Sequence, residues 1–130
     1  MNKVFIDSSI LIESFKGNDK AIDIIRQLVE ERYVMFINPI VFSEVIYISI
    51  KYGDKHRLNK VFEFLDSFVM LNITYEIVNL AKNYILNYDM LPNDALILAT
   101  AKHYGIATLA TLDKDFAKPT RSENIKILGI

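Results

Sequence analysis

The feature that most constrains the fold of this chain is a repeated alternation between short apolar runs and longer segments with helical spacing. Apolar positions that recur every three or four residues indicate amphipathic helices, whereas short apolar runs indicate buried strands. The pattern predicts strands at 3–6, 33–37, 69–73, 106–111 and 125–128, and helices at 8–16, 19–33, 39–52, 55–68, 75–88 and 92–104. We therefore predict an α/β fold, a three-layer α/β/α arrangement around a central, mainly parallel sheet of about five strands.

The composition is that of an ordinary globular domain. Of the 130 residues, 52% are hydrophobic and 24% are charged, so we predict a single domain over residues 1–130. No apolar run approaches the roughly 20 residues that span a bilayer. The first apolar run directly follows "MNK", which leaves no room for a signal peptide. We therefore expect a cytoplasmic location.

The inventory of side chains argues against several chemistries. The absence of cysteine excludes a disulfide framework, a thiolate zinc site and a cysteine nucleophile. The two histidines, His56 and His103, stand near no other ligand type at metal spacing, which argues against zinc. A G-x-S-x-G elbow, a P-loop and a dinucleotide-binding glycine loop are all absent from the sequence. The net charge of −1 gives no overall attraction for nucleic acid, so a polyanion would need a local basic patch or bound cations.

Two carboxylates follow predicted strands directly. Asp7 ends the run "VFID", and Asp113 follows "IATLAT", with Thr111 two residues earlier on the same face. The carboxyl ends of parallel strands meet at one edge of a sheet, where ligands bind in α/β folds. Each acid also has a structural interpretation, because Asp caps helices and is common in turns.

Glu44 and Asp94 lie on predicted helices. Glu44 sits in "INPIVFSEVIYISI", which is apolar almost all round and therefore predicts near-complete burial. A buried carboxylate requires a partner, and no Lys or Arg occurs between Tyr33 and Lys51, which leaves a distant base or a bound cation. Asp94 opens "NDALILATA", where the helix dipole alone also favours an acid. Carboxylates without His or Cys select hard cations such as Mg²⁺ or Mn²⁺.

These segments together resemble the PIN-domain family, and within it the VapC-type ribonuclease toxins. The resemblance covers essentially the whole chain and rests on motifs in the family's order. They are the strand, acid and helix of "VFIDSSILIESF", the mid-helix glutamate of "PIVFSEVIYI", the helix-opening aspartate of "LPNDALILATAKHYGIATLAT", and the acidic run "TLDKDF".

The resemblance implies roles for individual residues. Asp7, Glu44, Asp94 and Asp113 would form the acidic cluster that holds Mg²⁺ or Mn²⁺. Ser9, which stands where the family often has Asn, and Thr111 would be polar supports of the carboxylates, and Asp115 occupies a position that is often acidic. The implied activity is metal-dependent cleavage of RNA phosphodiesters by an endoribonuclease, the toxin of a VapBC-type toxin–antitoxin pair.

The resemblance also implies partners, namely an RNA substrate, a cognate antitoxin whose tail covers the active-site groove, and a second copy in a homodimer. Phe15, Phe42 and Tyr47 could form such surfaces or could belong to the core. The basic stretch 51–60 and the run Lys114, Lys118 and Arg121 could hold phosphates or could be ordinary solvated surface.

Two other functions fit the same residues. A receiver-like domain also gathers acids at strand ends around Mg²⁺ and accepts a phosphoryl group on one Asp. It has no need of a buried acid such as Glu44 in the middle of a helix. A non-catalytic PIN-type module that binds RNA or protein is the second alternative, and the presence of acids at all four positions argues against it.

Overall fold

The computed structural model of the protein describes residues 2–53 and 55–130 and contains a five-stranded sheet. The strands are β1 (Lys3–Ile6), β2 (Val34–Ile37), β3 (Val69–Met70), β4 (Thr108–Ala110) and β5 (Lys126–Leu128). They lie in the order β3-β2-β1-β4-β5, and every neighbouring pair is parallel. The prediction of a mainly parallel sheet of this size is confirmed, although β3 and β4 are shorter than predicted.

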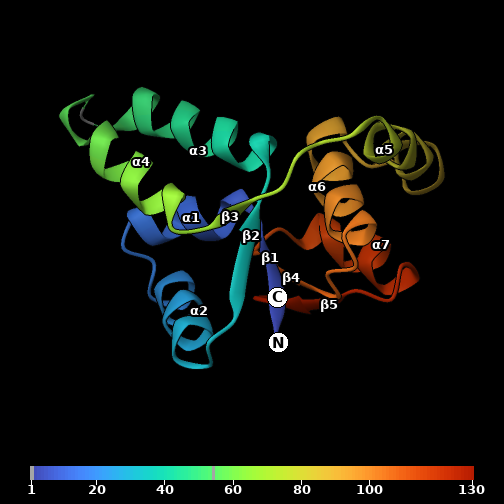
Figure 1. Ribbon diagram of the computed structural model, residues 1–130, viewed down its shortest axis with the longest axis horizontal. Helices are drawn as coiled ribbons and strands as arrows, with labels where there is room; N and C mark the ends of the chain where they lie inside the picture. Colours follow the sequence, from blue (N-terminus) through green and yellow to red (C-terminus); the bar gives the residue numbers. More distant parts are fainter. Residues whose placement is uncertain (1, 54) are drawn as a thin grey trace.

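Helices cover the sheet on both sides, which confirms the three-layer arrangement. In Figure 1 the helices α1 to α4 gather to the left of the sheet and α5 to α7 to its right. The helices are α1 (Ser8–Phe15), α2 (Asp19–Glu30), α3 (Pro39–Tyr52), α4 (Leu58–Asp66), α5 (Tyr75–Tyr88), α6 (Pro92–His103) and α7 (Ala117–Ser122). Two 3₁₀ turns, η1 (Lys55–Arg57) and η2 (Lys114–Phe116), precede α4 and α7.

Local capping residues set several of these helix boundaries. Asn38 accepts a hydrogen bond from the backbone N–H of Val41 at the start of α3, and Thr74 does the same for Ile77 in α5. These starts were predicted correctly. Helix α2 ends three residues before the predicted limit, because Arg32 adopts a positive φ of 58°, which a right-handed helix cannot continue. The predicted helix 55–68 is divided into η1 and α4, and the η2–α7 segment was not predicted.

The order of the strands places a topological switch point beside β1, the position at which α/β sheets form a crevice. The chain adds β2 and β3 on one side of β1 and then crosses to add β4 and β5 on the other side. Ile6 pairs with Ala110, so the carboxyl ends of β1 and β4 lie next to each other. The backbone N–H of Asp7 donates to the carbonyl of Ala110 over 2.9 Å. This is the kind of switch point where α/β folds bind their ligands.

Helix α3 is less buried than its apolar sequence predicted. Only Val41 and Val45 are buried, whereas Phe42, Tyr47 and Ile50 are 38%, 60% and 63% exposed. The prediction of near-complete burial was wrong because α3 packs against α1, α4 and α6 and leaves the rest of its surface exposed, and composition does not tell which side is covered. Among the residues described, no helix has both the length and the apolarity needed to cross a membrane.

Candidate metal centre

Asp7 lies at the carboxyl end of β1 with only 3% of its surface exposed. It occupies the N-cap position of α1, and its Oδ2 accepts hydrogen bonds from the Ser9 and Thr111 hydroxyls, each over 2.7 Å. Burial raises the pKa of Asp7, and these two hydrogen bonds act in the opposite direction. The two predicted supports, Ser9 and Thr111, therefore contact the carboxylate for which they were expected.

The same two hydroxyls hold the end of β4 against the end of β1. Ser9 Oγ accepts the backbone N–H of Leu112 over 3.0 Å, and Thr111 Oγ1 accepts that of Asp113 over 3.0 Å. Asp113 in turn caps the η2 turn, because its Oδ1 accepts the backbone N–H of Asp115 over 2.9 Å. The turn interpretation of Asp113 is therefore correct, and it places the carboxylate at the crevice.

Glu44 reaches the crevice from α3 and is half-buried rather than fully buried. Its Oε1 accepts the Ser8 hydroxyl over 2.9 Å, and its Oε2 accepts the Asn93 amide over 3.5 Å. Burial raises the pKa of Glu44, and the charges of Asp7 and Asp113 raise it further.

No basic side chain neutralises these acids in the part of the chain that the structure describes. The ion pairs found there, Lys16–Glu13 and Arg26–Asp23, lie on α1 and α2 and include none of the crevice acids. Of the two partners left open for Glu44 in the sequence, a distant base is therefore absent from the described residues.

Asp94 is the third residue of α6, and its carboxylate is strongly perturbed. Its pKa is raised to about 7, mainly because burial disfavours the charge and next because Asp113, Asp7 and Glu44 repel it. A helix N-terminus by itself would lower the pKa. Repulsion and burial therefore outweigh the dipole, and the carboxylate has no hydrogen-bond donor among the described residues.

The tightest group of acids consists of Asp94, Asp113 and Asp115, each of which offers a carboxylate oxygen within 4.8 Å of the others. Asp115 was expected to be a supporting residue, yet the structure places it in this group. Asp7 and Glu44 lie outside the group as defined by this distance, although both raise the pKa of Asp94. The acids predicted from the sequence thus share one electrostatic environment.

The donor set fits a hard divalent cation. Every candidate ligand is a carboxylate oxygen, which Mg²⁺ and Mn²⁺ prefer, and neither imidazole nor thiolate is part of the group. A cavity of about 220 Å³ opens beside the group and is lined by residues that include Tyr88, Asp94 and Asp115. A cation with part of its water shell has room there, and it would relieve the repulsion that raises the pKa of Asp94.

Sequence reasoning missed Ser8 and Asn93, which bind the two oxygens of Glu44. Both residues stand directly next to a predicted site residue, Ser8 after Asp7 and Asn93 before Asp94. This position next to a predicted site residue was the signal in the sequence that pointed to Ser8 and Asn93. Their contact with α3 depends on how three elements pack, which the sequence does not display.

Comparisons with known proteins agree with this geometry. The family model described as "PIN domain" matches residues 4–121. Ribonuclease VapC6 and Ribonuclease VapC2 of Methanocaldococcus jannaschii are 35% and 36% identical to the chain. These matches span 96% and 97% of the chain, and 97% and 95% of the relatives' own lengths.

Solved structures show the same fold. A toxin–antitoxin complex from Klebsiella pneumoniae contains a chain with 27% identity and a TM-score of 0.75, and the match covers 96% of this chain and 95% of that one. VapBC2 from Rickettsia felis, solved bound to a DNA fragment from its promoter, matches with a TM-score of 0.77 at 20% identity over 97% of both chains.

Proposed function

The chain belongs to the PIN-domain family, and on this premise we propose that it is a metal-dependent endoribonuclease, the toxin of a VapBC-type toxin–antitoxin pair. The resemblance inferred from the sequence is confirmed, which removes the receiver-like alternative. Two relatives named as ribonucleases match nearly the whole chain. The observation that carries the proposal is the convergence of unneutralised carboxylates at the carboxyl edge of a parallel sheet.

We assign the cation to Asp94, Asp113 and Asp115, with Asp7 and Glu44 completing the negative environment. Mg²⁺ or Mn²⁺ bound there would supply charge stabilisation for an RNA phosphodiester and a water of lowered pKa as the nucleophile. Asp94 has no hydrogen-bond donor among the described residues, so its carboxylate is available to the cation.

The remaining side chains orient the acids. The Ser9 and Thr111 hydroxyls fix Asp7 by binding one of its oxygens. The Ser8 hydroxyl directs Glu44 from α3 into the crevice. Such fixed carboxylates lose little conformational freedom when a cation and a substrate bind, which is the benefit of a preorganised site.

A cleavage assay on single-stranded RNA tests the activity. Mg²⁺ or Mn²⁺ should support cleavage, EDTA should abolish it, and added Mg²⁺ should restore it. Asp94→Asn should be inactive, whereas the exposed Asp23→Asn on α2 should retain the activity of the parent. Cleavage by the purified protein that persists in EDTA would refute the metal-dependent mechanism, and no cleavage under any of these conditions would favour a non-catalytic module.

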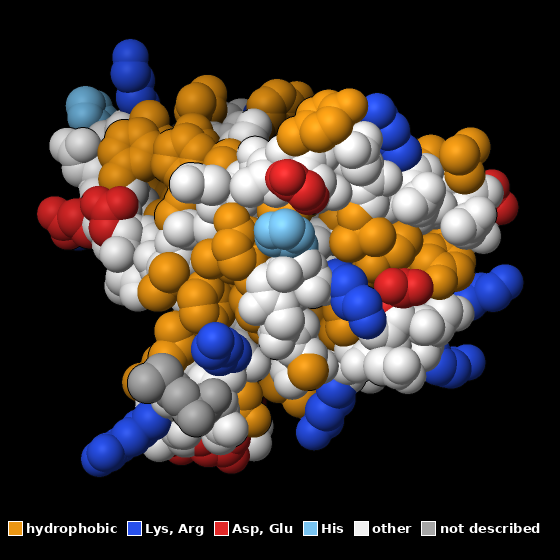
Figure 2. Space-filling model, turned by 45° about the vertical axis from the view of Figure 1, so that its right-hand side comes forward, with side chains coloured by type: hydrophobic (Ala, Val, Ile, Leu, Met, Phe, Trp, Pro, Cys, Tyr) orange, Lys and Arg blue, Asp and Glu red, His pale blue; other side chains and the backbone are white. Residues whose placement is uncertain are grey.

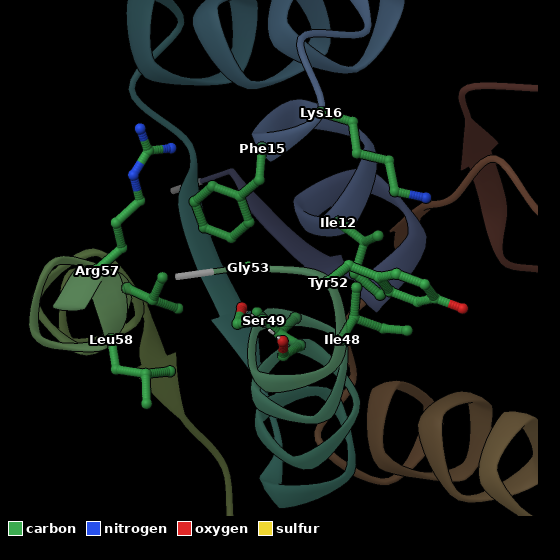
Figure 3. Close-up of a pocket in the computed structure, with 11 residues that line it drawn as sticks. Ile12, Phe15, Lys16, Ile48, Ser49, Tyr52, Gly53, Arg57 and Leu58 are labelled. Atoms are coloured by element: carbon green, nitrogen blue, oxygen red, sulfur yellow. Dashed lines mark hydrogen bonds between the residues drawn. The ribbon is translucent and has the colours of Figure 1, made fainter. Parts of the chain in front are cut away.

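An apolar groove between α1, α3 and the η1–α4 segment suits the antitoxin partner that this assignment requires. The groove encloses about 240 Å³, and its lining includes Ile12, Phe15, Tyr52 and Leu58. Figure 3 shows Ile12 from α1 beside Tyr52 from α3 on one side of the groove, Leu58 on the other side, and Phe15 between them. Phe15 is 46% exposed, so it belongs to the surface, as do Phe42 and Tyr47 on α3, which answers the question left open by the sequence.

This groove differs from the active-site groove expected from the sequence, because its lining includes none of the site acids. We propose that the antitoxin covers it with an apolar segment, because apolar surface of this kind is usually protected by a partner. Leu58→Asp should abolish co-purification with the product of an adjacent short antitoxin gene, whereas Leu86→Asp, a change at an exposed position on α5, should not. Equal co-purification of both variants would place the antitoxin elsewhere. We also expect a homodimer, which light scattering on the purified protein measures directly.

A further inference from the structure

A second hollow lies beside the acidic group, on the C-terminal part of the chain. It has a volume of about 550 Å³, and its lining includes Lys114, Arg121, Ile125, Ile127 and Ile130. Lys114 stands between Asp113 and Asp115 in the η2 turn, so this turn contributes residues both to the hollow and to the acidic group. We call this surface the Lys114–Arg121 hollow.

The cations of this region lack acidic partners. Lys114, Lys118 and Arg121 are exposed, and no carboxylate lies within 4.0 Å of any of their charged groups in the described ranges 2–53 and 55–130. Figure 2, which brings the side of α5 to α7 forward, shows Lys and Arg side chains projecting separately along the right-hand edge of this face. Lys114, Lys118 and Arg121 thus provide positive charge without an ion-pair partner among the described residues, on a chain whose net charge is −1.

The acid that directly follows α7, Glu123, is engaged elsewhere. Glu123 accepts the Tyr84 hydroxyl at Oε1 over 2.8 Å and the Tyr88 hydroxyl at Oε2 over 2.6 Å. Both carboxylate oxygens are therefore directed toward α5 and do not neutralise Arg121. The two tyrosines keep the positive charge of the hollow available to a ligand.

The segment that carries these cations is anchored firmly. Phe116 is fully buried, and the buried Thr120 hydroxyl donates to its carbonyl over 2.6 Å. Lys114 and Arg121 therefore project from a fixed turn and a fixed helix rather than from a loose loop. A fixed backbone does not have to be ordered when its side chains bind a phosphate, which lowers the entropic cost of binding.

From these observations we propose that the Lys114–Arg121 hollow binds the RNA strand next to the cleaved phosphodiester. Phosphates would contact Lys114 and Arg121, and a ribose or an unstacked base would cover the aliphatic floor formed by Ile125 and Ile127. This inference rests on the proposed ribonuclease function. Continuity with the acidic group favours RNA over an acidic peptide, because a strand held at the metal centre must continue along one of its flanks.

Binding of a fluorescent single-stranded RNA to the Asp94→Asn protein in EDTA tests the surface without cleavage. Lys114→Gln and Arg121→Gln, added singly, should each raise the Kd at least about threefold, because each removes one phosphate contact. The slope of log K against log salt should become shallower by about 0.7 for each variant, the value for one phosphate of a single strand. Lys20→Gln, the same charge change on α2, should alter neither quantity.

The kinetics of RNA cleavage separate this inference from the proposed ribonuclease function. They are measured for Lys114→Gln and Arg121→Gln made in the parent protein, without Asp94→Asn. The substitutions should raise KM and leave kcat near the parent value, because they remove binding that is equal in the ground and transition states. If the parent protein fails to cleave RNA, the proposed function fails, and the binding measurement still decides the role of the hollow. The inference would be overturned if Lys114→Gln and Arg121→Gln had the same RNA Kd and salt slope as Lys20→Gln. It would also be overturned if these two variants lost affinity for the antitoxin and not for RNA.

Discussion

Asn38 donates a hydrogen bond from its side-chain amide to the Thr100 hydroxyl over 2.9 Å, and both residues are fully buried. Asn38 caps α3, which carries Glu44, and Thr100 lies on α6, which carries Asp94. Glu44 and Asp94 each lie six residues from their end of this bond, so the bond fixes the two acid-bearing helices against each other. A buried polar pair of this kind specifies one helix arrangement where an apolar contact would allow several.

Cutting this bond should weaken cation binding. Thr100→Val removes the hydroxyl, and Asn38→Ser removes the amide while keeping an oxygen that can cap α3. We expect both to lower the free energy of unfolding by about 1–3 kcal/mol and to reduce the rise in Tm that Mg²⁺ produces in the parent. Thr100→Ser keeps the hydroxyl and should retain most of the Mg²⁺ response.

The control separates positioning from general destabilisation. Ser49→Ala removes a hydroxyl that bonds within α3, to the carbonyl of Val45, and joins no second helix. The rise in Tm that Mg²⁺ produces in Ser49→Ala should equal that of the parent, even if the variant is less stable. A full Mg²⁺ response in Thr100→Val would show that the Asn38–Thr100 bond serves folding alone.

Removal of one charge from the acidic group should relieve repulsion. Asp94→Asn keeps the shape of the side chain and eliminates the carboxylate on which Asp113, Asp7 and Glu44 act. We expect metal-free thermal stability to stay unchanged or to rise, activity to be lost, and the stabilisation by Mg²⁺ to shrink. Asp113→Asn should also lose activity and part of the Mg²⁺ response.

Melting curves with EDTA and with Mg²⁺ measure these quantities, and a cleavage assay accompanies them. If Asp94→Asn lost more than about 1 kcal/mol of metal-free stability, the size of a helix cap, Asp94 would be a structural residue. Asp19→Asn, a change at the first turn of α2, serves as the matched control for an acid at a helix start.

The sequence located the strand-end acids because their placement depends on topology alone. Asp7 and Asp113 follow strands that pair in parallel, with Ile6 opposite Ala110, so they had to meet at one edge. The burial of Glu44 depends on which side of α3 faces α1 and α6. Apolar residues surround that helix, and the pattern therefore contains no information about its orientation.

Asp115 illustrates the limit of periodicity in short turns. It follows Asp113 by two residues in a 3₁₀ turn, where the chain bends back and brings both carboxylates near Asp94. Helix and strand periods do not apply there, so its membership of the group could not be read from spacing. The Asn38–Thr100 bond was likewise invisible, because 62 residues separate its partners.

Metal-free stability should fall as the pH rises. Asp94 has a folded pKa of about 7 against an ordinary value of 3.8, so the folded protein binds more protons between these values than the unfolded chain. Its contribution to stability is complete below about pH 4 and is lost as the pH rises through about 7. The raised pKa values of Asp7 and Glu44 act in the same direction.

Urea unfolding in EDTA between about pH 5 and about pH 8 measures this dependence. Asp94→Asn should show a shallower decline than the parent, and saturating Mg²⁺ should flatten the parent curve. A metal-free parent whose stability rose with pH over this range would contradict the repulsion on which the site assignment depends.

The Thr111 hydroxyl joins the two strand ends, because it donates to Asp7 Oδ2 and accepts the backbone N–H of Asp113. Thr111→Val keeps the shape of this fully buried side chain and removes both bonds, leaving Ser9 as the remaining hydroxyl on Asp7. We expect a loss of about 1–3 kcal/mol in the free energy of unfolding together with a weaker Mg²⁺ response.

Two companion variants decide whether this loss reflects the site. Thr111→Ser preserves the hydroxyl and should recover most of the Mg²⁺ response, although it loses a methyl group from the core. Thr120→Val removes an equally buried hydroxyl that bonds only to carbonyls of its own segment, and it should cost stability without changing the Mg²⁺ response. If Thr111→Val and Thr120→Val bound Mg²⁺ equally well, Thr111 would support the fold and not the carboxylates, because its hydroxyl would then have no effect on how Asp7 and Asp113 receive the cation.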